Sequence, residues 1–191
     1  MKRKKQAHIL NAAESLFNRF GIKKTGVDEI AKHARVAKGT LYNYFGNKEG
    51  IIRELMANKL TSFEENITSA MTTISDPVEQ MKIVIMERIK IFLKNPFISD
   101  NTLQLDDQNT RLFQEDLDRK EVSFLESVTR QARQQGKLSS NEKQVIDTVL
   151  FTIKGIEQHI KNGFESVSLE RIEKDIDYLV TLFFPDQPGK V

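Results

Sequence analysis

Long stretches of this sequence contain neither glycine nor proline, and this shortage of breakers favours helices over other elements. Only four prolines occur, at positions 77, 96, 185 and 188. Between them apolar residues recur at helical spacing, and no strand-like alternation bounded by turns is evident. The sequence therefore predicts an all-α fold.

About nine helices are expected from the apolar spacing and the helix-end signals. Eight of them span about 4–20, 25–34, 38–44, 48–74, 77–94, 110–135, 141–163 and 168–184, and a short ninth falls in the least regular segment, 97–110. Thr25-Gly26-Val27-Asp28 fits a capping box in which Thr25 caps the second helix and Asp28 reaches back. Asp76-Pro77 marks a helix start, and Gly21, Gly136 and Gly163 mark helix ends.

Composition places the chain among ordinary foldable proteins, with 39% hydrophobic and 29% charged residues. No apolar run approaches the ~20 residues that a membrane span needs. The basic start, Met1 to Lys5, continues into an amphipathic segment without the apolar core of a secretory signal. Cysteine is absent. We therefore expect a cytoplasmic protein without a membrane partner.

Charge is distributed unevenly along the chain, although the net charge is only +2. Residues 1–50 contain eleven Lys and Arg against four acids, whereas the remainder contains 18 against 23. A basic N-terminal part on an acidic body suggests a polyanion partner for that part alone. By charge alone, a merely solvated basic tail explains the pattern equally well.

Two short helices separated by a three- or four-residue turn and preceded by a helix form a helix-turn-helix arrangement. In its second helix, Lys38 to Tyr44, we expect Leu41 and Phe45 to pack against Ile30 and the first helix. Polar and aromatic side chains would then face outward, as suits contacts with phosphates and base edges in a DNA groove: Lys38, Thr40, Tyr42, Asn43 and Tyr44. Gly39 lets the backbone approach DNA closely. The alternative is a surface helix whose aromatic residues only pack inward.

Three segments closely resemble the tetracycline-repressor (TetR) family: Phe20-Gly21-Ile22-Lys23-Lys24-Thr25-Gly26-Val27-Asp28-Glu29-Ile30-Ala31, then Ala34-Arg35-Val36-Ala37-Lys38-Gly39-Thr40-Leu41-Tyr42-Asn43-Tyr44-Phe45, then Asn47-Lys48-Glu49. The resemblance implies a homeodomain-like helix-turn-helix domain of three helices in residues 1–47. It also implies a helical-bundle domain for ligand binding and dimerisation in residues 48–191. Phosphate contacts are implied for Thr25 and Lys48. The full set of implied DNA-binding residues is Thr25, Gly26, Arg35, Lys38, Gly39, Thr40, Tyr42, Asn43, Tyr44 and Lys48.

Two positions depart from the family pattern. Arg35 stands in the turn where the family often has Gly, and Ala37 stands where Ser or Thr often caps the second helix. A left-handed conformation would cost Arg35 about 1 kcal/mol relative to Gly, and Arg35 would offset part of this with an extra phosphate contact. Ala37 forgoes a cap that contributes typically ~1 kcal/mol.

A single recognition helix buries too little surface to be specific, so we expect a homodimer on a palindromic operator. By resemblance, the last two helices would form the dimer face, lined by Ile146, Val149, Leu150, Ile153, Ile156, Ile160, Ile172, Ile176, Leu179, Val180 and Phe183. The alternative is that these stripes face the chain's own core, as at least one of them must.

Phe and Met gather in the middle helices, as in adaptable apolar sites. Apolar residues at helical spacing more often form a core than line a pocket. Members of the TetR family, however, usually bind an inducer in this region. The candidate pocket comprises Phe63, Ile67, Met81, Ile85, Met86, Ile89, Phe92, Leu105, Phe113, Leu117, Phe124 and Phe151. Glu87, Arg88 and Glu121 are the few charged candidates for the inward faces, so a largely apolar effector is favoured.

No constellation for an enzyme, a metal or a cofactor is apparent, since His8, His33 and His159 are scattered and no phosphate-binding Gly-rich loop occurs. The sequence therefore predicts a DNA-binding regulator, most simply a repressor released by a small molecule. An activator on the same fold and a helical protein-interaction module are the alternatives.

Overall fold

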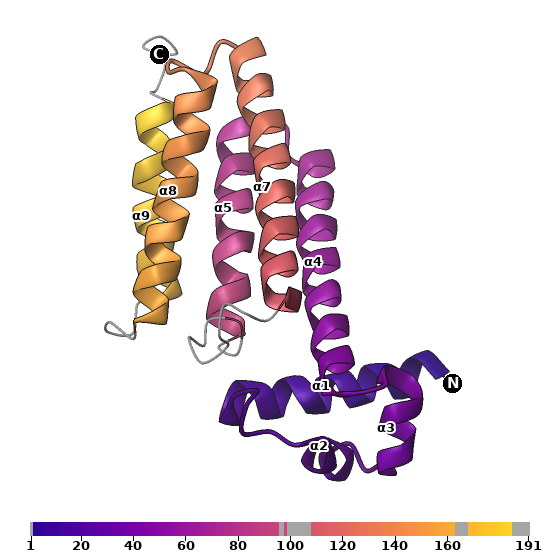
Figure 1. Ribbon diagram of the computed structural model, residues 1–191. Coiled ribbons are helices and arrows are strands. Elements are labelled where there is room, and N and C mark those ends of the chain that lie inside the picture. The colour runs from indigo at the N-terminus through magenta and orange to yellow at the C-terminus, as the bar shows by residue number, and fades with distance from the viewer. Residues whose placement is uncertain (1, 96–97, 99–107, 163–167, 185–191) are drawn as a thin grey trace. The chain divides into compact units, whose positions relative to one another are not determined.

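The computed structural model describes residues 2–95, 98, 108–162 and 168–184. Within these residues it contains eight helices and no strand, which confirms the all-α prediction (Figure 1). The helices are α1 (Lys2–Phe20), α2 (Val27–His33), α3 (Lys38–Phe45), α4 (Lys48–Thr73), α5 (Pro77–Lys94), α7 (Gln108–Gln134), α8 (Glu142–Lys161) and α9 (Leu169–Phe183). Most of the segment expected to hold a ninth helix, as well as Gly163, lies outside the described residues.

Local end signals explain most helix boundaries. Helix α5 begins at Pro77, and the backbone N–H of Val78 donates to the Asp76 side chain at 3.2 Å. Asn141 caps α8 by accepting from the N–H groups of Lys143 and Gln144, and Ser168 caps α9. Beyond α7, Gly136 takes φ = 67°, the left-handed conformation that glycine adopts cheaply.

A capping box begins α2, but the prediction assigned it to the wrong residues. The N-cap is Gly26, and its N–H donates to the carboxylate of Glu29 at 2.7 Å. The hydroxyl of Thr25 instead donates backwards to the carbonyl of Gly21 at 2.8 Å. A carboxylate three residues beyond the N-cap has the reach for this bond, so Glu29, and not Asp28, takes the role.

The chain divides into two compact units, and the divisions fall within α4, at the end of α5 and within α7. The first unit contains Met1–Thr61 and Lys94–Asp116, and the second contains Ser62–Leu93 and Leu117–Val191. The expected domain boundary between residues 47 and 48 stays a prediction.

In the first unit, α1, α2, α3 and the start of α4 share one apolar core. Ile9, Phe17, Ile30 and Leu41 are each at most 1% exposed, as expected for Ile30 and Leu41, whereas Phe45 is only half-buried. Gly50 marks a close approach: a Cβ there would lie 1.9 Å from the Phe45 carbonyl oxygen. The path from α3 into α4 therefore requires glycine.

In the second unit α5 packs among its neighbours, with buried residues on nearly every face of the helix. Met81, Val84, Ile85 and Ile89 have no exposed surface. Ion pairs place the other helices around α5, since Arg88 contacts Asp118 of α7 and Glu157 of α8, and Lys82 contacts Asp177 of α9. Across the described residues, no helix is both long and apolar enough to cross a membrane.

Candidate functional site

The segment from α2 to α3 forms the expected helix-turn-helix, with a four-residue turn at positions 34–37. The turn closes α2 with two backbone hydrogen bonds: Arg35 N–H donates to Lys32 O at 3.1 Å and Val36 N–H to Ala31 O at 3.0 Å. This is a Schellman motif, whose C′ residue is left-handed. Arg35 is that residue, with φ = 51°, the one positive value among the described non-glycine residues. The expectation of a left-handed Arg35 is confirmed.

Helix α3 begins without a side-chain cap. Its N-cap is Ala37, which has no side-chain acceptor for the first N–H groups of the helix. Its other end closes at Gly46, with φ = 74°. The expected missing cap is confirmed. The N–H of Thr40 donates to the Ala37 carbonyl at 2.9 Å, and the N–H groups of Lys38 and Gly39 before it depend on solvent or on a ligand for hydrogen bonds.

The outer surface of α3 carries most of the residues predicted to contact DNA. Lys38, Gly39 and Asn43 are exposed, Tyr42 is 43% exposed, and Thr40 and Tyr44 are half-buried. A Cβ added at Gly39 would meet no atom of the described chain within 4 Å. The fold itself therefore does not require glycine at this position, which leaves room for an external partner to approach the backbone.

An exposed ion pair joins α2 to α3. Lys38 Nζ lies 2.8 Å from Asp28 Oδ1 and donates to Oδ2 at 3.0 Å. The hydrogen bond and the charge of Asp28 raise the pKa of Lys38, so it stays protonated throughout the physiological range. Such exposed pairs exchange readily, because solvent screens them.

Two of the predicted phosphate contacts differ from expectation. Thr25 is only 1% exposed and its hydroxyl is bonded to Gly21, which contradicts a contact between this side chain and phosphate. Lys48 is half-buried, and its ammonium donates to the carbonyls of Ile22 at 3.0 Å and Thr25 at 3.3 Å. Both side chains thus hold the connection between α1 and α2. The remaining candidates in this region, Gly26 and Arg35, are exposed.

The candidate pocket residues of the second unit mostly lie in its apolar interior. Phe63, Ile67, Met81, Ile85, Met86, Ile89, Phe92 and Leu117 are buried, and Phe124 is half-buried with its ring in a T-shaped contact with Phe63. Phe113 is buried but belongs to the first unit, and Leu105 lies outside the described residues. Phe151 is 82% exposed, so its assignment to an interior pocket is wrong.

A buried charged cluster stands among these apolar residues. Arg88 of α5 donates from Nε to Glu157 Oε1 of α8 at 2.6 Å, and its Nη2 lies 2.8 Å from Asp118 Oδ1 of α7. Its Nη1 lies 3.6 Å from Glu121 Oε2, also of α7. Arg88 and Glu121 have fully buried side chains. Burial raises the pKa of the Glu121 carboxyl to about 7, although the charge of Arg88 opposes the rise.

Arg88 and Glu121 were among the charged candidates for inward faces, but Asp118 and Glu157 were missed. A signal for Glu157 was present, because it continues the Val149–Ile153 stripe of α8 by one further step of four residues. Glu121 occupies the same kind of position between Leu117 and Leu125, both of which are fully buried.

The predicted dimer face is wrong for six of its eleven residues. Val149, Ile153, Ile172, Ile176, Val180 and Phe183 are buried in the chain's own core. Ile146, Leu150, Ile156, Ile160 and Leu179 are half-buried at its edge. The apolar residues that do face outward on α8 and α9 are Phe151, Tyr178 (70% exposed), Leu182 (55%) and Leu169 (38%).

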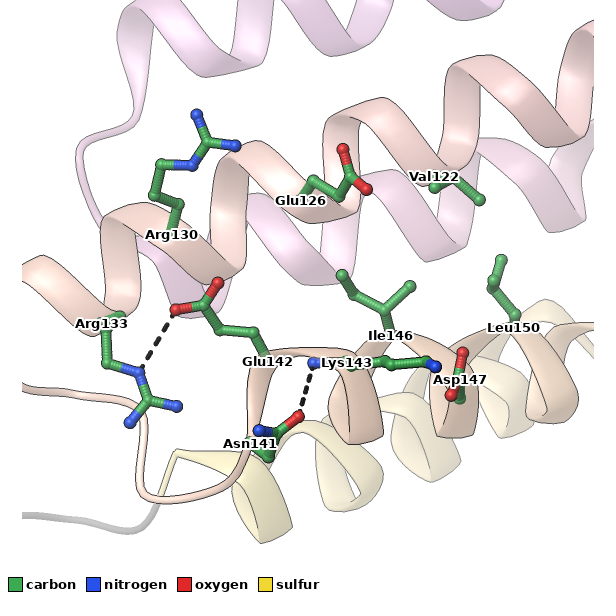
Figure 2. A pocket seen from close by; sticks show the side chains of 10 residues that line it. All are labelled: Val122, Glu126, Arg130, Arg133, Asn141, Glu142, Lys143, Ile146, Asp147 and Leu150. Carbon is green, nitrogen blue, oxygen red and sulfur yellow. Dashed lines mark hydrogen bonds and ion pairs between the residues drawn. The ribbon is translucent and has the colours of Figure 1, made fainter.

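Figure 2 shows a groove between α7 and α8 that is separate from the candidate pocket residues. Both acidic and basic side chains line it, and Arg133 Nε lies 3.3 Å from Glu142 Oε1. The lining residues are Val122, Glu126, Arg130, Arg133, Asn141, Glu142, Lys143, Ile146, Asp147 and Leu150. Among the described residues, no group of three or more His, Cys, Asp or Glu is arranged to hold a metal ion.

Comparison with known proteins agrees with this geometry. Residues 9–55 match the family described as "Bacterial regulatory proteins, tetR family". Over 106 residues the chain is 34% identical to the HTH-type transcriptional regulator YhgD of Bacillus subtilis, covering 50% of this chain and 56% of that protein. The chain spans about half or less of the length of the curated relatives it matches first.

Solved structures match over nearly the whole chain. AibR in complex with isovaleryl coenzyme A and operator DNA is 25% identical with a TM-score of 0.66, covering 95% of this chain and 98% of AibR. The fatty acid degradation regulator FadR of Bacillus halodurans shares the fold, with a TM-score of 0.75 and 21% identity over 97% of both chains. The helix-turn-helix and the family match over residues 9–55 show that this part of the chain is a TetR-family DNA-binding region, and the chain shares the fold of these solved structures.

Proposed function

We propose that the chain is a repressor that binds a palindromic DNA operator as a homodimer and leaves it when an acyl-coenzyme A binds to the second unit. The observation that supports DNA binding most directly is the outer surface of α3, where Lys38, Tyr42 and Asn43 are exposed together on an uncapped helix. An exposed tyrosine and an uncapped helix N-terminus bring no stability to a surface that only contacts water. Phosphates of a DNA backbone accept hydrogen bonds from both the tyrosine hydroxyl and the free N–H groups of the helix.

In this proposal the base edges are contacted by α3 and the phosphates by its surroundings. Asn43 suits adenine and Lys38 suits guanine, since their side chains match the hydrogen-bond patterns of those bases in the major groove. Gly39 admits the DNA backbone, while Thr40, Tyr42 and Tyr44 supply hydroxyl donors. Arg35, Gly26 and Lys48 lie at the flanks, and Lys48 must exchange its carbonyl partners before it can contact a phosphate.

Exposed apolar residues on α8 and α9 support the homodimer. A single chain gains no stability from leaving Phe151, Tyr178 and Leu182 in water. A two-fold interface would bury these three residues on both chains of the dimer. We expect Phe151→Glu to convert the dimer to a monomer in sedimentation velocity. Ser123→Glu, which adds the same charge on an exposed site of α7, serves as the control and should stay dimeric. A dimer unaffected by Phe151→Glu would contradict this face.

Release by an acyl-coenzyme A is supported by the AibR complex, which covers 95% of this chain and contains both isovaleryl coenzyme A and operator DNA. The apolar interior around Phe63, Met81 and Phe92 suits an acyl chain. The test is fluorescence anisotropy with labelled DNA from upstream of the gene, titrated with isovaleryl-CoA and with stearoyl-CoA. We expect one of them to weaken DNA binding by roughly 5–150-fold, and DNA to weaken binding of that acyl-CoA by the same factor. Equal DNA affinity with and without both acyl-CoAs would refute this effector class and leave DNA binding itself intact.

A further inference from the structure

The ion pair between α2 and α3 lies on the surface that carries the candidate DNA contacts. The side chain of Asp28 is 72% exposed and that of Lys38 51% exposed, and both residues belong to the first unit. Ion pairs between exposed side chains contribute little to folding stability, because solvent screens them and both side chains lose conformational freedom. The stability of the helix-turn-helix therefore does not account for this pair.

Lys38 also occupies a position that is unfavourable for a cation. It is the first residue of α3, and the N–H groups at a helix start carry partial positive charge. The first turn of α3 contains no acidic residue, and Ala37 before it has no side-chain acceptor. The carboxylate of Asp28, from the neighbouring helix, supplies the negative charge that α3 itself lacks. A lysine at this position thus indicates a role other than stabilising α3.

The contact with Asp28 fixes the direction of the Lys38 ammonium. Lys38 Nζ lies 2.8 Å from Asp28 Oδ1 and 3.0 Å from Oδ2, so both carboxylate oxygens share the ammonium. A lysine without such a partner reaches base edges and phosphates alike, because its stem is long and flexible. An ammonium has three N–H donors, and at least one of them stays available beside the two Asp28 oxygens. Asp28 therefore restricts where Lys38 points without using all of its donors.

DNA bound to α3 would strengthen this restriction. The duplex excludes solvent from the ion pair, and the attraction between the two charges rises as the local dielectric constant falls. The carboxylate of Asp28 also repels phosphates of any sequence. DNA that offers Lys38 a base acceptor keeps the ion pair and gains a hydrogen bond, whereas DNA without that acceptor experiences the repulsion alone. A repulsive element of this kind produces specificity between partners.

We propose that Asp28 determines part of the DNA sequence specificity, because it positions the Lys38 ammonium against a guanine in the major groove and disfavours DNA that lacks this guanine. The inference rests on the proposed function, which assigns base contacts to α3. It adds a residue that was not among the candidate DNA contacts. Asp28 acts through Lys38, so it is a positioning residue and makes no base contact of its own.

Fluorescence anisotropy with the operator that the original protein selects from random DNA tests this role. Lys38→Met should remove the preference at one base pair of each half-site, which identifies the pair that Lys38 contacts. A second duplex carries A·T in place of G·C at that pair, and the measured quantity is the ratio of the affinities for the two duplexes. We expect Asp28→Asn to lower this ratio by about threefold to tenfold, a part of what one base contact provides. Asp28→Glu, which keeps the charge, should retain most of the ratio.

Glu49→Gln is the matched control. Glu49 is likewise an exposed acid at the second position of a helix, α4, in the first unit. Its replacement should change affinity for both duplexes by the same factor and leave their ratio unchanged. Salt dependence also separates the two variants. Asp28→Asn frees Lys38 for a phosphate and should steepen the slope of affinity against salt by about one counterion, whereas Glu49→Gln should leave the slope as it is.

Equal affinity ratios in Asp28→Asn and Glu49→Gln would overturn the inference and leave DNA binding by α3 standing. An unchanged base preference in Lys38→Met would overturn it too, because Asp28 would then have no base contact to position. The double variant of Asp28→Asn and Lys38→Met should have the ratio of Lys38→Met alone, and a further fall would show that Asp28 acts by another route. Equal loss of affinity for both duplexes with a lower melting temperature would assign Asp28 to the fold instead. If the original protein selects no DNA sequence, the proposed function fails together with the inference.

Discussion

Replacing Glu121 with glutamine should change how the stability of the protein depends on pH. Burial raises the pKa of this carboxyl to about 7 in the folded chain, against its usual value of 4.5. The folded state therefore holds a proton that the unfolded state has already released between these two pH values. Stability from this group is complete below pH 4.5, falls as pH rises towards 7, and is constant above that.

The size of the effect follows from the two pKa values. Their difference, from 4.5 to about 7, at ~1.36 kcal/mol per pKa unit corresponds to about 3 kcal/mol. Glutamine does not titrate, so the free energy of unfolding of Glu121→Gln minus that of the original protein should rise by about 3 kcal/mol between pH 4.5 and pH 7.5.

Urea unfolding followed by circular dichroism measures this difference at several pH values, at a fixed protein concentration so that any dimer contributes equally. Carboxyl groups outside the Arg88 cluster titrate alike in both proteins and cancel. One of them is Asp76: burial opposes its ionisation, but Lys137 and the Val78 N–H lower its pKa overall. A difference that stays flat across this pH range would show that Glu121 titrates like an exposed carboxyl and would refute its burial beside Arg88.

Three substitutions test the helix-turn-helix and the connection from α3 into α4. Arg35→Gly should stabilise the protein by about 1 kcal/mol in thermal unfolding, because it relieves the strain of the left-handed conformation. It should also reduce the slope of DNA affinity against salt by about one released counterion. Loss of stability would contradict the Schellman geometry. Ala37→Ser should add a helix cap and raise stability by about 1 kcal/mol without altering the preferred operator sequence, and a destabilised protein would count against the capping argument. Gly50→Ala should cost about 1–3 kcal/mol, since its Cβ would lie 1.9 Å from the Phe45 carbonyl oxygen, and an unchanged melting temperature would exclude this close approach.

Features that depend on a few neighbouring residues were predictable from the sequence. The start of α5 follows from Asp76-Pro77, and the left-handed Arg35 and uncapped Ala37 follow from their positions in the turn. The α2 cap shows the limit of this reasoning. Thr25 and Gly26 are both acceptable caps, and the burial of Thr25 under α1 decided between them.

Features that depend on which helix face meets which neighbour were not predictable. The stripes of α8 and α9 have the same spacing whether they face a partner chain or the core, and Ile176 and Val180 turned out to be core. Phe151 illustrates the converse, because a phenylalanine on an amphipathic helix suggests the interior, yet it is 82% exposed. The cluster around Arg88 required three helices to meet, and no local pattern specifies that meeting.

The central claim, that the exposed surface of α3 binds DNA, is tested most directly by the affinity of Asn43→Ala for an operator selected from random DNA by the original protein. The original protein should select a palindrome and lose affinity steeply as salt rises. We expect Asn43→Ala to weaken binding by about 1–3 kcal/mol and to relax the preference at one base pair of each half-site, with an unchanged salt slope. Equal affinity and equal sequence preference in Asn43→Ala and the original protein would contradict the account.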